Sequence, residues 1–349
     1  MPSPRLGQRN GLGASSASKA RLACFDWARA FGCVAIVALH VFTTLWESVG
    51  RASFSPARAF IEGSLAIVIG RWAVPVFLMI TGALLLNPEK SVGWDRIGRY
   101  VQRMLFVLGT FGLVFCLIES VVTHRSVSLA VVGEALWNLL TAQSWGHLWY
   151  VYALLGLYLL TPALRKLTVM RDRRSLEVAL AVLYVVVLGG MTVLHVAQHT
   201  LFPRVMLLPA LFYYLLGWYT WEYMELDVRT VSLGALSLVA LVACQAIGHG
   251  EMALPQYCLV APYGVLVFLL FVRFGTRPMA EVPMVASLAD LSFGIYVVHP
   301  LFLHVLIRLF DPLAFPAGVF ELLAFSITMV GSILLVKVVR LLPGFAERI

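Results

Sequence analysis

Runs of about twenty apolar residues alternate with short polar segments along almost the whole chain. A helix needs roughly 20 mainly apolar residues to cross the hydrocarbon core of a bilayer, so each run is long enough to span it. We predict ten spans, near 25–46, 62–86, 101–122, 147–164, 176–197, 205–221, 231–248, 257–274, 286–308 and 317–340. The predicted fold class is therefore all-α, a polytopic membrane bundle of about ten transmembrane helices.

The first residues lack this pattern. Residues 1–22 are rich in Ser, Gly and Ala with interspersed basic residues, and they contain no apolar core followed by a small-residue cleavage site. We interpret residues 1–22 as a disordered basic cytoplasmic tail rather than a signal peptide, followed by one transmembrane domain at 23–349.

Composition supports a membrane protein. Hydrophobic residues make up 60% of the chain and charged residues 13%, with a mean hydropathy of +0.88. A water-soluble fold needs more charge to cover its surface. The net charge of +8 is spread between apolar runs rather than gathered into the stripe typical of nucleic-acid binding. The five cysteines have neither metal-ligand spacing nor a disulfide framework.

The distribution of basic residues predicts the orientation. If the N-terminus is cytoplasmic, ten spans place 20 of the 26 Lys and Arg residues on the cytoplasmic side and 6 on the other. Such a bias follows the positive-inside rule. Both termini are therefore predicted to be cytoplasmic, and the localisation to be the cell (inner) membrane.

The first span carries ionisable residues that are costly inside a bilayer. At about 100° per residue, Arg29, His40 and Glu47 fall on one helix face, with His40 about 16 Å above Arg29. Arg29 and Glu47 also fit a plainer interpretation as interfacial residues, one of them snorkelling to the headgroups. His40 lies too deep for that, although a lone buried His is often only a packing residue.

Two further residues are predicted at the depth of His40. Arg71 lies in the outer half of the second span, and His299 lies in the ninth, just before Pro300. A histidine exchanges protons near neutral pH, and a guanidinium stabilises an oxyanion. These groups indicate either a reaction centre or a proton relay through a transporter. We predict no metal site, since the pair His195 and His199 lacks the Glu of a zinc-protease motif.

Arg96, Arg99 and Arg103 have spacings that place them on one side of a helix entering the membrane. They fit an ordinary positive-inside anchor, or a clamp for phosphates, because guanidinium groups match phosphate oxygens.

The segment that begins at 146 is rich in aromatic residues, including Trp149 and Tyr150 after His147. Such residues are expected at a membrane interface, and they also stack on sugar rings.

In this order, these stretches resemble the acyltransferase family 3 membrane proteins, which O-acylate bacterial surface polysaccharides. Arg29 and His40 match a family motif in which a basic residue is followed, after ten intervening residues, by a His. The stretch RWAVPVFLMITGALLL is similar to its VPxFFxxSGxLL signature, with Leu78 and Thr81 at the Phe and Ser positions. Arg96-Ile97-Gly98-Arg99 matches its cytoplasmic Arg-x-x-Arg, while HLWYVYALLGLYLLTP and SFGIYVVHP resemble later signatures. The likeness is greatest to the short, single-domain O-acetyltransferase subgroup.

The resemblance implies transfer of an acyl group, commonly acetyl, from cytoplasmic acyl-CoA to a hydroxyl of an envelope glycan or lipid-linked sugar. No cofactor is expected to be bound permanently; acetyl-CoA is the donor substrate. By analogy His40 is central to catalysis as general base or acyl carrier, with Arg29 as its basic partner, and we add Arg71 as the oxyanion donor. Arg96 and Arg99 would hold the CoA phosphates, with Arg103 added from spacing alone. The expected acceptor-binding residues are Glu47, His147, Trp149, Tyr150 and His299.

The alternative is a polysaccharide exporter or a proton-coupled transporter without acyl transfer. Against it, the two halves of the chain lack paired interrupted helices in corresponding positions. The expected partners are acyl-CoA, the glycan acceptor and the lipid bilayer, without nucleic acid.

Overall fold

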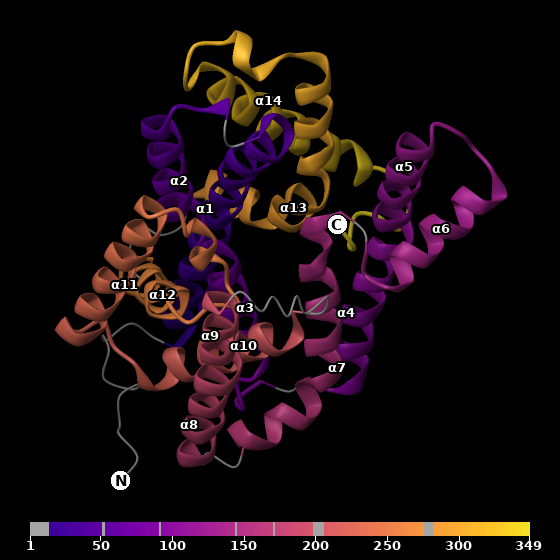
Figure 1. Ribbon diagram of the computed structural model, residues 1–349. Helices are drawn as coiled ribbons and strands as arrows, with labels where there is room; N and C mark the ends of the chain where they lie inside the picture. Colours follow the sequence, from indigo (N-terminus) through magenta and orange to yellow (C-terminus); the bar gives the residue numbers. More distant parts are fainter. Residues whose placement is uncertain are drawn as a thin grey trace.

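The computed structural model describes residues 14–50, 53–90, 92–143, 145–169, 172–197, 206–275 and 282–349, with the backbone alone for 14–22. Within these ranges the chain is helical and contains no strand. Its α-helices are α1 (Ala14–Val49), α2 (Pro56–Gly70), α3 (Ala73–Leu85), α4 (Trp94–Val107), α5 (Leu113–His124), α6 (Leu129–Leu140), α7 (Trp149–Val169), α8 (Arg173–Val182), α9 (Gly190–Val196), α10 (Leu207–Tyr223), α11 (Val228–Ala246), α12 (Val260–Phe274), α13 (Pro283–Leu309) and α14 (Val319–Val339). Figure 1 shows how they pack into one bundle.

Eight helical segments of the described residues are long and apolar enough to cross a membrane. They are Ala23–Val49, Pro56–Leu85, Trp94–His124, Gly146–Val169, Arg173–Val196, Val228–Ala246, Pro283–Leu309 and Val319–Val339. Each overlaps one of the predicted spans. The chain is thus a multi-pass membrane protein, and the predicted all-α membrane bundle is confirmed.

The remaining two predicted spans correspond to α10 and α12, which are shorter, at 17 and 15 residues. Most of α10 is buried against protein rather than exposed to lipid. It lies against α3 so closely that a Cβ added at Gly82 would meet the Tyr214 carbonyl oxygen at 1.8 Å. A Cβ at Gly217 would likewise meet the Met79 carbonyl oxygen at 2.1 Å. This pair of glycines lets the two backbones touch.

The structure does not test the predicted tail at 1–22. α1 begins at Ala14, nine residues before the predicted start of the membrane domain at 23, and the residues before Ala14 lie outside the described part of the chain. The disorder predicted for the tail therefore stays a prediction.

Contacts between helix ends agree with the predicted alternation of direction. Arg165, near the end of α7, donates to the Leu85 carbonyl at the end of α3 and to the Asn87 carbonyl just after it. Arg340, after α14, bonds Asp290 in the second turn of α13. At the opposite ends of the helices, Arg58 of α2 pairs with Glu321 of α14 at 2.6 Å. The ends predicted to share a side therefore lie together. Which side faces the cytoplasm stays a prediction.

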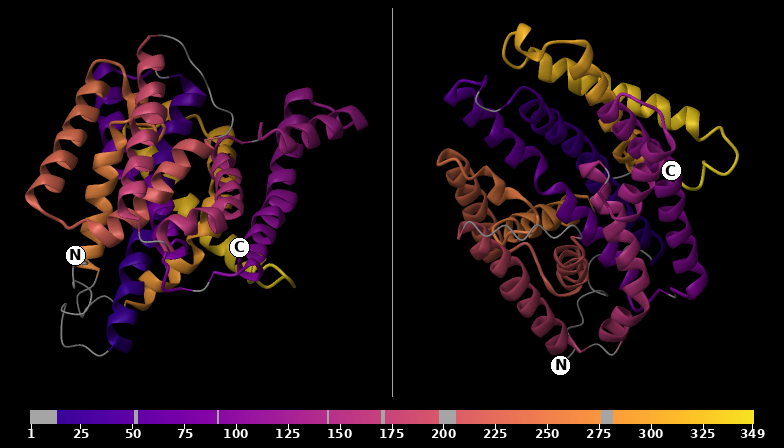
Figure 2. Two further views of the ribbon diagram at one scale, coloured as in Figure 1. Left: turned by 90° about the horizontal axis from the view of Figure 1, so that it is seen from below. Right: turned by 45° about the vertical axis from the view of Figure 1, so that its right-hand side comes forward.

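One feature was not expected from the sequence. After α5 the chain turns back into the short apolar helix α6, and this hairpin stands away from the bundle (Figures 1 and 2). Several apolar side chains of α6 are exposed, among them Trp137 and Leu140. An exposed apolar hairpin of this kind suits contact with lipid.

Candidate active site

A histidine pair joins the first and ninth predicted spans. His40 of α1 places its Nδ1 2.9 Å from Nε2 of His299 of α13, with ring centroids 4.9 Å apart. His299 is completely buried, whereas His40 is partly accessible. The α1–α13 contact, one of the most extensive in the bundle, brings together two residues 259 positions apart. His40 therefore faces a partner helix rather than lipid.

Pro300 explains why His299 is held in place. A proline has no N–H, so the carbonyl of Tyr296, four residues earlier, lacks its usual helical donor. Nδ1 of His299 fills that position, 2.8 Å from the Tyr296 oxygen and 3.1 Å from the Ile295 oxygen. The sequence His-Pro thus builds its own side-chain anchor inside α13.

A third histidine packs against this pair. His147 precedes α7, is buried, and has its ring centroid 5.8 Å from that of His299. Its Nε2 lies 3.2 Å from the Val297 oxygen, and the Tyr296 hydroxyl donates to its carbonyl. His147 therefore joins α7 to α13 next to the pair, deeper than the interface position considered from the sequence.

Arg71 lies where α2 and α3 meet, at a break that divides the second predicted span. Its charge is close enough to interact with both His40 and Glu47. Nε of Arg71 is buried and has no hydrogen-bond partner among the described residues. The guanidinium thus keeps an unused donor near the histidine pair.

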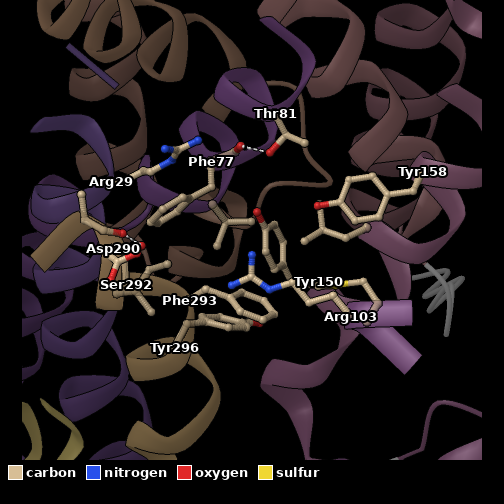
Figure 3. A pocket seen from close by; sticks show the side chains of 15 residues that line it. Arg29, Phe77, Thr81, Arg103, Tyr150, Tyr158, Asp290, Ser292, Phe293 and Tyr296 are labelled. Carbon is tan, nitrogen blue, oxygen red and sulfur yellow. Dashed lines mark hydrogen bonds between the residues drawn. The ribbon is translucent and has the colours of Figure 1, made fainter. Parts of the chain in front are cut away.

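A cavity of about 270 Å³ lies between the histidine pair and Arg29, on the side of Arg29. It is lined by Arg29, Ile36, Val74, Phe77, Thr81, Arg103, Met104, Tyr150, Leu154, Tyr158, Ala289, Asp290, Ser292, Phe293 and Tyr296. Figure 3 shows the side chains of Arg29 and Arg103 around this space, together with Tyr150, Tyr158 and Tyr296. A mixed polar and aromatic lining of this kind suits a ligand that is partly polar and partly apolar.

The cavity ends about one helical turn from the histidine pair. Ile36 lies four residues before His40 on α1, about 6 Å along the axis. Tyr296 both lines the cavity and places its ring 6.0 Å from that of His299. His40, Arg71 and His299 are not among the lining residues, and Tyr296 lies between the cavity and His299.

The three arginines predicted to bind phosphate lie in two different environments. Arg96 and Arg99 are exposed on the first turns of α4. Arg103 turns inward, where its guanidinium lies 4.6 Å from the Phe293 ring centroid and Nε donates to the Arg348 carbonyl at 3.0 Å. Arg103 therefore belongs to the cavity, while the other two lie at its cytoplasmic approach in the predicted orientation.

Of the remaining predicted site residues, two line the cavity and two lie outside it. Arg29 lines the cavity and makes a long ion pair with Asp26 at 3.7 Å, and Tyr150 points into the cavity rather than to an outer mouth. Glu47 is exposed at the far end of α1, and Trp149 is half-buried with its ring beside that of Tyr150. No group of three His, Cys, Asp or Glu residues able to hold a metal occurs in the described ranges.

Sequence reasoning missed the α13 and α7 residues that complete the cavity. Asp290, Phe293 and Tyr296 lie in the same apolar stretch as His299, and Tyr158 lies two turns after Tyr150. Asp290 carried a usable signal, because an acidic residue in an apolar helix needs a partner. It finds that partner in Arg340.

The chain thus forms a multi-pass helical bundle in which a histidine pair lies above an arginine-lined cavity. The chain matches the acyltransferase domain model of acyltransferase family 3 over residues 22–337. It therefore belongs to this family and is a membrane acyltransferase. No curated protein and no solved structure matches the chain significantly.

Proposed function

We propose that the protein is an O-acyltransferase of the cell inner membrane that transfers an acyl group, most simply acetyl, from cytoplasmic acyl-CoA to a hydroxyl of an envelope glycan or lipid-linked sugar. The observation that carries the proposal is the hydrogen bond between His40 and His299, one turn above the cavity that holds Arg29 and Arg103. Membership of an acyltransferase family favours this function over an exporter or a proton-coupled transporter.

The donor is proposed to enter from the side of α4. Arg96 and Arg99, both exposed there, would bind the phosphates of CoA. Arg103 and Arg29 line the cavity into which the pantetheine arm would extend, so the thioester would reach the level of Ile36 and Tyr296. CoA would thus remain on its own side of the bilayer. It is a substrate, and the proposal includes no permanently bound cofactor.

The chemistry is proposed to take one of two routes at His40. As general base, its imidazole removes the proton of the acceptor hydroxyl while the oxygen attacks the thioester carbonyl; the C–S bond breaks and the CoA thiolate leaves and is protonated. As nucleophile, the imidazole attacks the carbonyl first, the C–S bond breaks, and the CoA thiolate leaves and is protonated. The acceptor hydroxyl then attacks the acyl-imidazole carbonyl, the C–N bond breaks, and the hydroxyl proton is released to solvent. Arg71, with its unused donor, would stabilise the oxyanion in either route.

The acceptor is proposed to approach from the outer end of α1. Glu47 is exposed there, and His147, just before α7, packs against His299 with ring centroids 5.8 Å apart. His299 would contact the acceptor only through His40, because it is fully buried.

The test uses purified protein in proteoliposomes, with acetyl-CoA labelled in the acetyl group and an extract of envelope glycolipids and polysaccharide as acceptor. We expect label to enter the glycan fraction. His40→Ala should lower the rate by at least about 100-fold, the scale of a lost general base. The control is His124→Ala, which removes an exposed histidine paired with Glu134 on the α5–α6 hairpin and should leave the rate unchanged.

Full activity of a folded His40→Ala protein would remove His40 from the mechanism. Absence of label transfer by the wild type, with movement of glycan across the vesicle membrane, would favour the exporter alternative.

A further inference from the structure

Neither the family match nor the sequence assigns a protonation state to the histidine pair, but the contacts around it do. Pro300 leaves the Tyr296 carbonyl without a backbone donor. Nδ1 of His299 faces this oxygen at 2.8 Å and the Ile295 oxygen at 3.1 Å. Carbonyl oxygens only accept hydrogen bonds, so Nδ1 of His299 carries a proton.

The other nitrogen of His299 follows from its burial. The ring is fully buried, and no carboxylate bonds it within the described part of the chain. A second proton would make it an unpaired charge inside the bundle, at high cost. His299 is therefore neutral, and its Nε2 has a lone pair.

The lone pair on His299 then determines the tautomer of His40. Nδ1 of His40 lies 2.9 Å from Nε2 of His299. Because that Nε2 offers a lone pair, Nδ1 of His40 carries the proton and donates the hydrogen bond. In a neutral ring the remaining nitrogen, Nε2, is unprotonated. The Arg71 guanidinium at the α2–α3 junction is a fixed positive charge near this ring, and it disfavours a second positive charge there.

We propose that His299 is a positioning residue which, anchored by the carbonyl that Pro300 frees, holds His40 as its Nδ1–H tautomer and so presents an unprotonated Nε2 to the reacting group. The proposal deepens the acyltransfer function and rests on it for the consequence in catalysis. It serves both routes, because a general base and a nucleophile each need a free lone pair on Nε2. The chain from backbone carbonyl through His299 to His40 orients the ring as the third group of a catalytic triad does.

The direct test does not depend on activity. Protein labelled with ¹⁵N-histidine is placed in nanodiscs at neutral pH, and the His40 signals are assigned as those absent from the His40→Gln spectrum. We expect a protonated Nδ1 and an unprotonated Nε2 for His40, with a scalar coupling between its Nδ1 and Nε2 of His299. A His40 ring protonated on Nε2 would overturn the proposal, whether or not the protein transfers acyl groups.

The kinetic test separates positioning from a structural role. His299→Phe removes the acceptor for Nδ1–H, and we expect kcat to fall about 100-fold with the KM for acetyl-CoA unchanged, as for the loss of a group that orients a catalytic base. His299→Gln keeps an acceptor oxygen at the reach of Nε2 and should recover kcat to within about tenfold of the wild type.

Thermal unfolding of both variants shows whether they fold. A folded His299→Phe protein with kcat within twofold of the wild type, or a Gln variant no better than Phe, would contradict the role of His299. If the wild type transfers no acyl group but the NMR result holds, the acyltransfer proposal fails and the tautomer assignment stands.

Discussion

At the scale of single residues, the two exposed arginines of α4 have a different role from the buried groups. Arg96 and Arg99 lie on the surface, where they are free to meet a ligand without rearrangement of the bundle. If they bind CoA phosphates, Arg99→Ala loses a charge-assisted hydrogen bond, which corresponds to about a 10- to 100-fold higher KM for acetyl-CoA with little change in kcat. Initial-rate kinetics on reconstituted protein measure this split.

The matched control is Arg174→Ala, an exposed arginine near the start of α8, which the predicted topology places on the same side. A KM that rises equally in both variants would indicate general electrostatic attraction of an anionic substrate rather than a phosphate site. With truncated acyl donors that lack the nucleotide phosphates, the wild type and Arg99→Ala should have the same KM.

The sequence predicted single residues best where a polar group interrupts an apolar run. His40 and His299 were placed at one depth from helix geometry, and they are hydrogen-bonded. The arrangement of Tyr296 and Phe293 escaped prediction, because aromatic residues in a membrane helix face lipid, protein or a cavity with equal ease. Only the crossing of α13 with α1, α3, α4 and α7 decides which of these they face.

At the scale of elements, the contact between α3 and α10 is the tightest backbone approach near the site. Gly82→Ala would place a methyl group 1.8 Å from the Tyr214 carbonyl oxygen. This oxygen belongs to the backbone, so the clash is relieved only if one of the two helices moves. We expect a loss of stability of about 3 kcal/mol or more, the upper range for overpacking. Thermal unfolding in detergent, followed by tryptophan fluorescence, measures the loss.

Gly133→Ala provides the comparison, since a Cβ at this exposed position on α6 meets nothing within 4 Å. There alanine should be neutral or slightly stabilising, because it restricts the unfolded chain. Equal unfolding temperatures for the two variants would show that α3 and α10 separate without cost.

Element prediction located a helical segment at each of the ten predicted spans, but two of these helices, α10 and α12, are shorter than the eight segments long enough to cross a membrane. α10 contains Tyr213, Tyr214 and Trp218, all buried, and such residues lower the hydropathy that marks a lipid-facing span. The break at Arg71 was also not predicted, although Pro75 carried a signal for it. Pro75 has no N–H to bond the carbonyl four residues earlier, which is that of Arg71, and its ring crowds that carbonyl.

At the scale of the whole molecule, the direction of acyl transfer depends on which face of the bundle is cytoplasmic. The alternation of helix ends is visible in the contacts, whereas the absolute orientation rests on the 20 to 6 division of basic residues. Single cysteines at exposed loop or helix-start positions test it with a membrane-impermeant maleimide on intact cells. Arg229→Cys, at the start of α11, reports the predicted cytoplasmic side, and Ala317→Cys, between α13 and α14, the outer side.

We expect maleimide to label Ala317→Cys in intact cells and Arg229→Cys only after the membrane is opened. The wild type gives the background from Cys244 and Cys258, since the other three cysteines are buried. The reversed labelling pattern would place Arg96 and Arg99 outside the cell, where acyl-CoA is not made. The cavity at Arg29 and Arg103 would then have to take the acceptor instead of the donor, and the mechanism would run in the opposite direction through the same histidine pair.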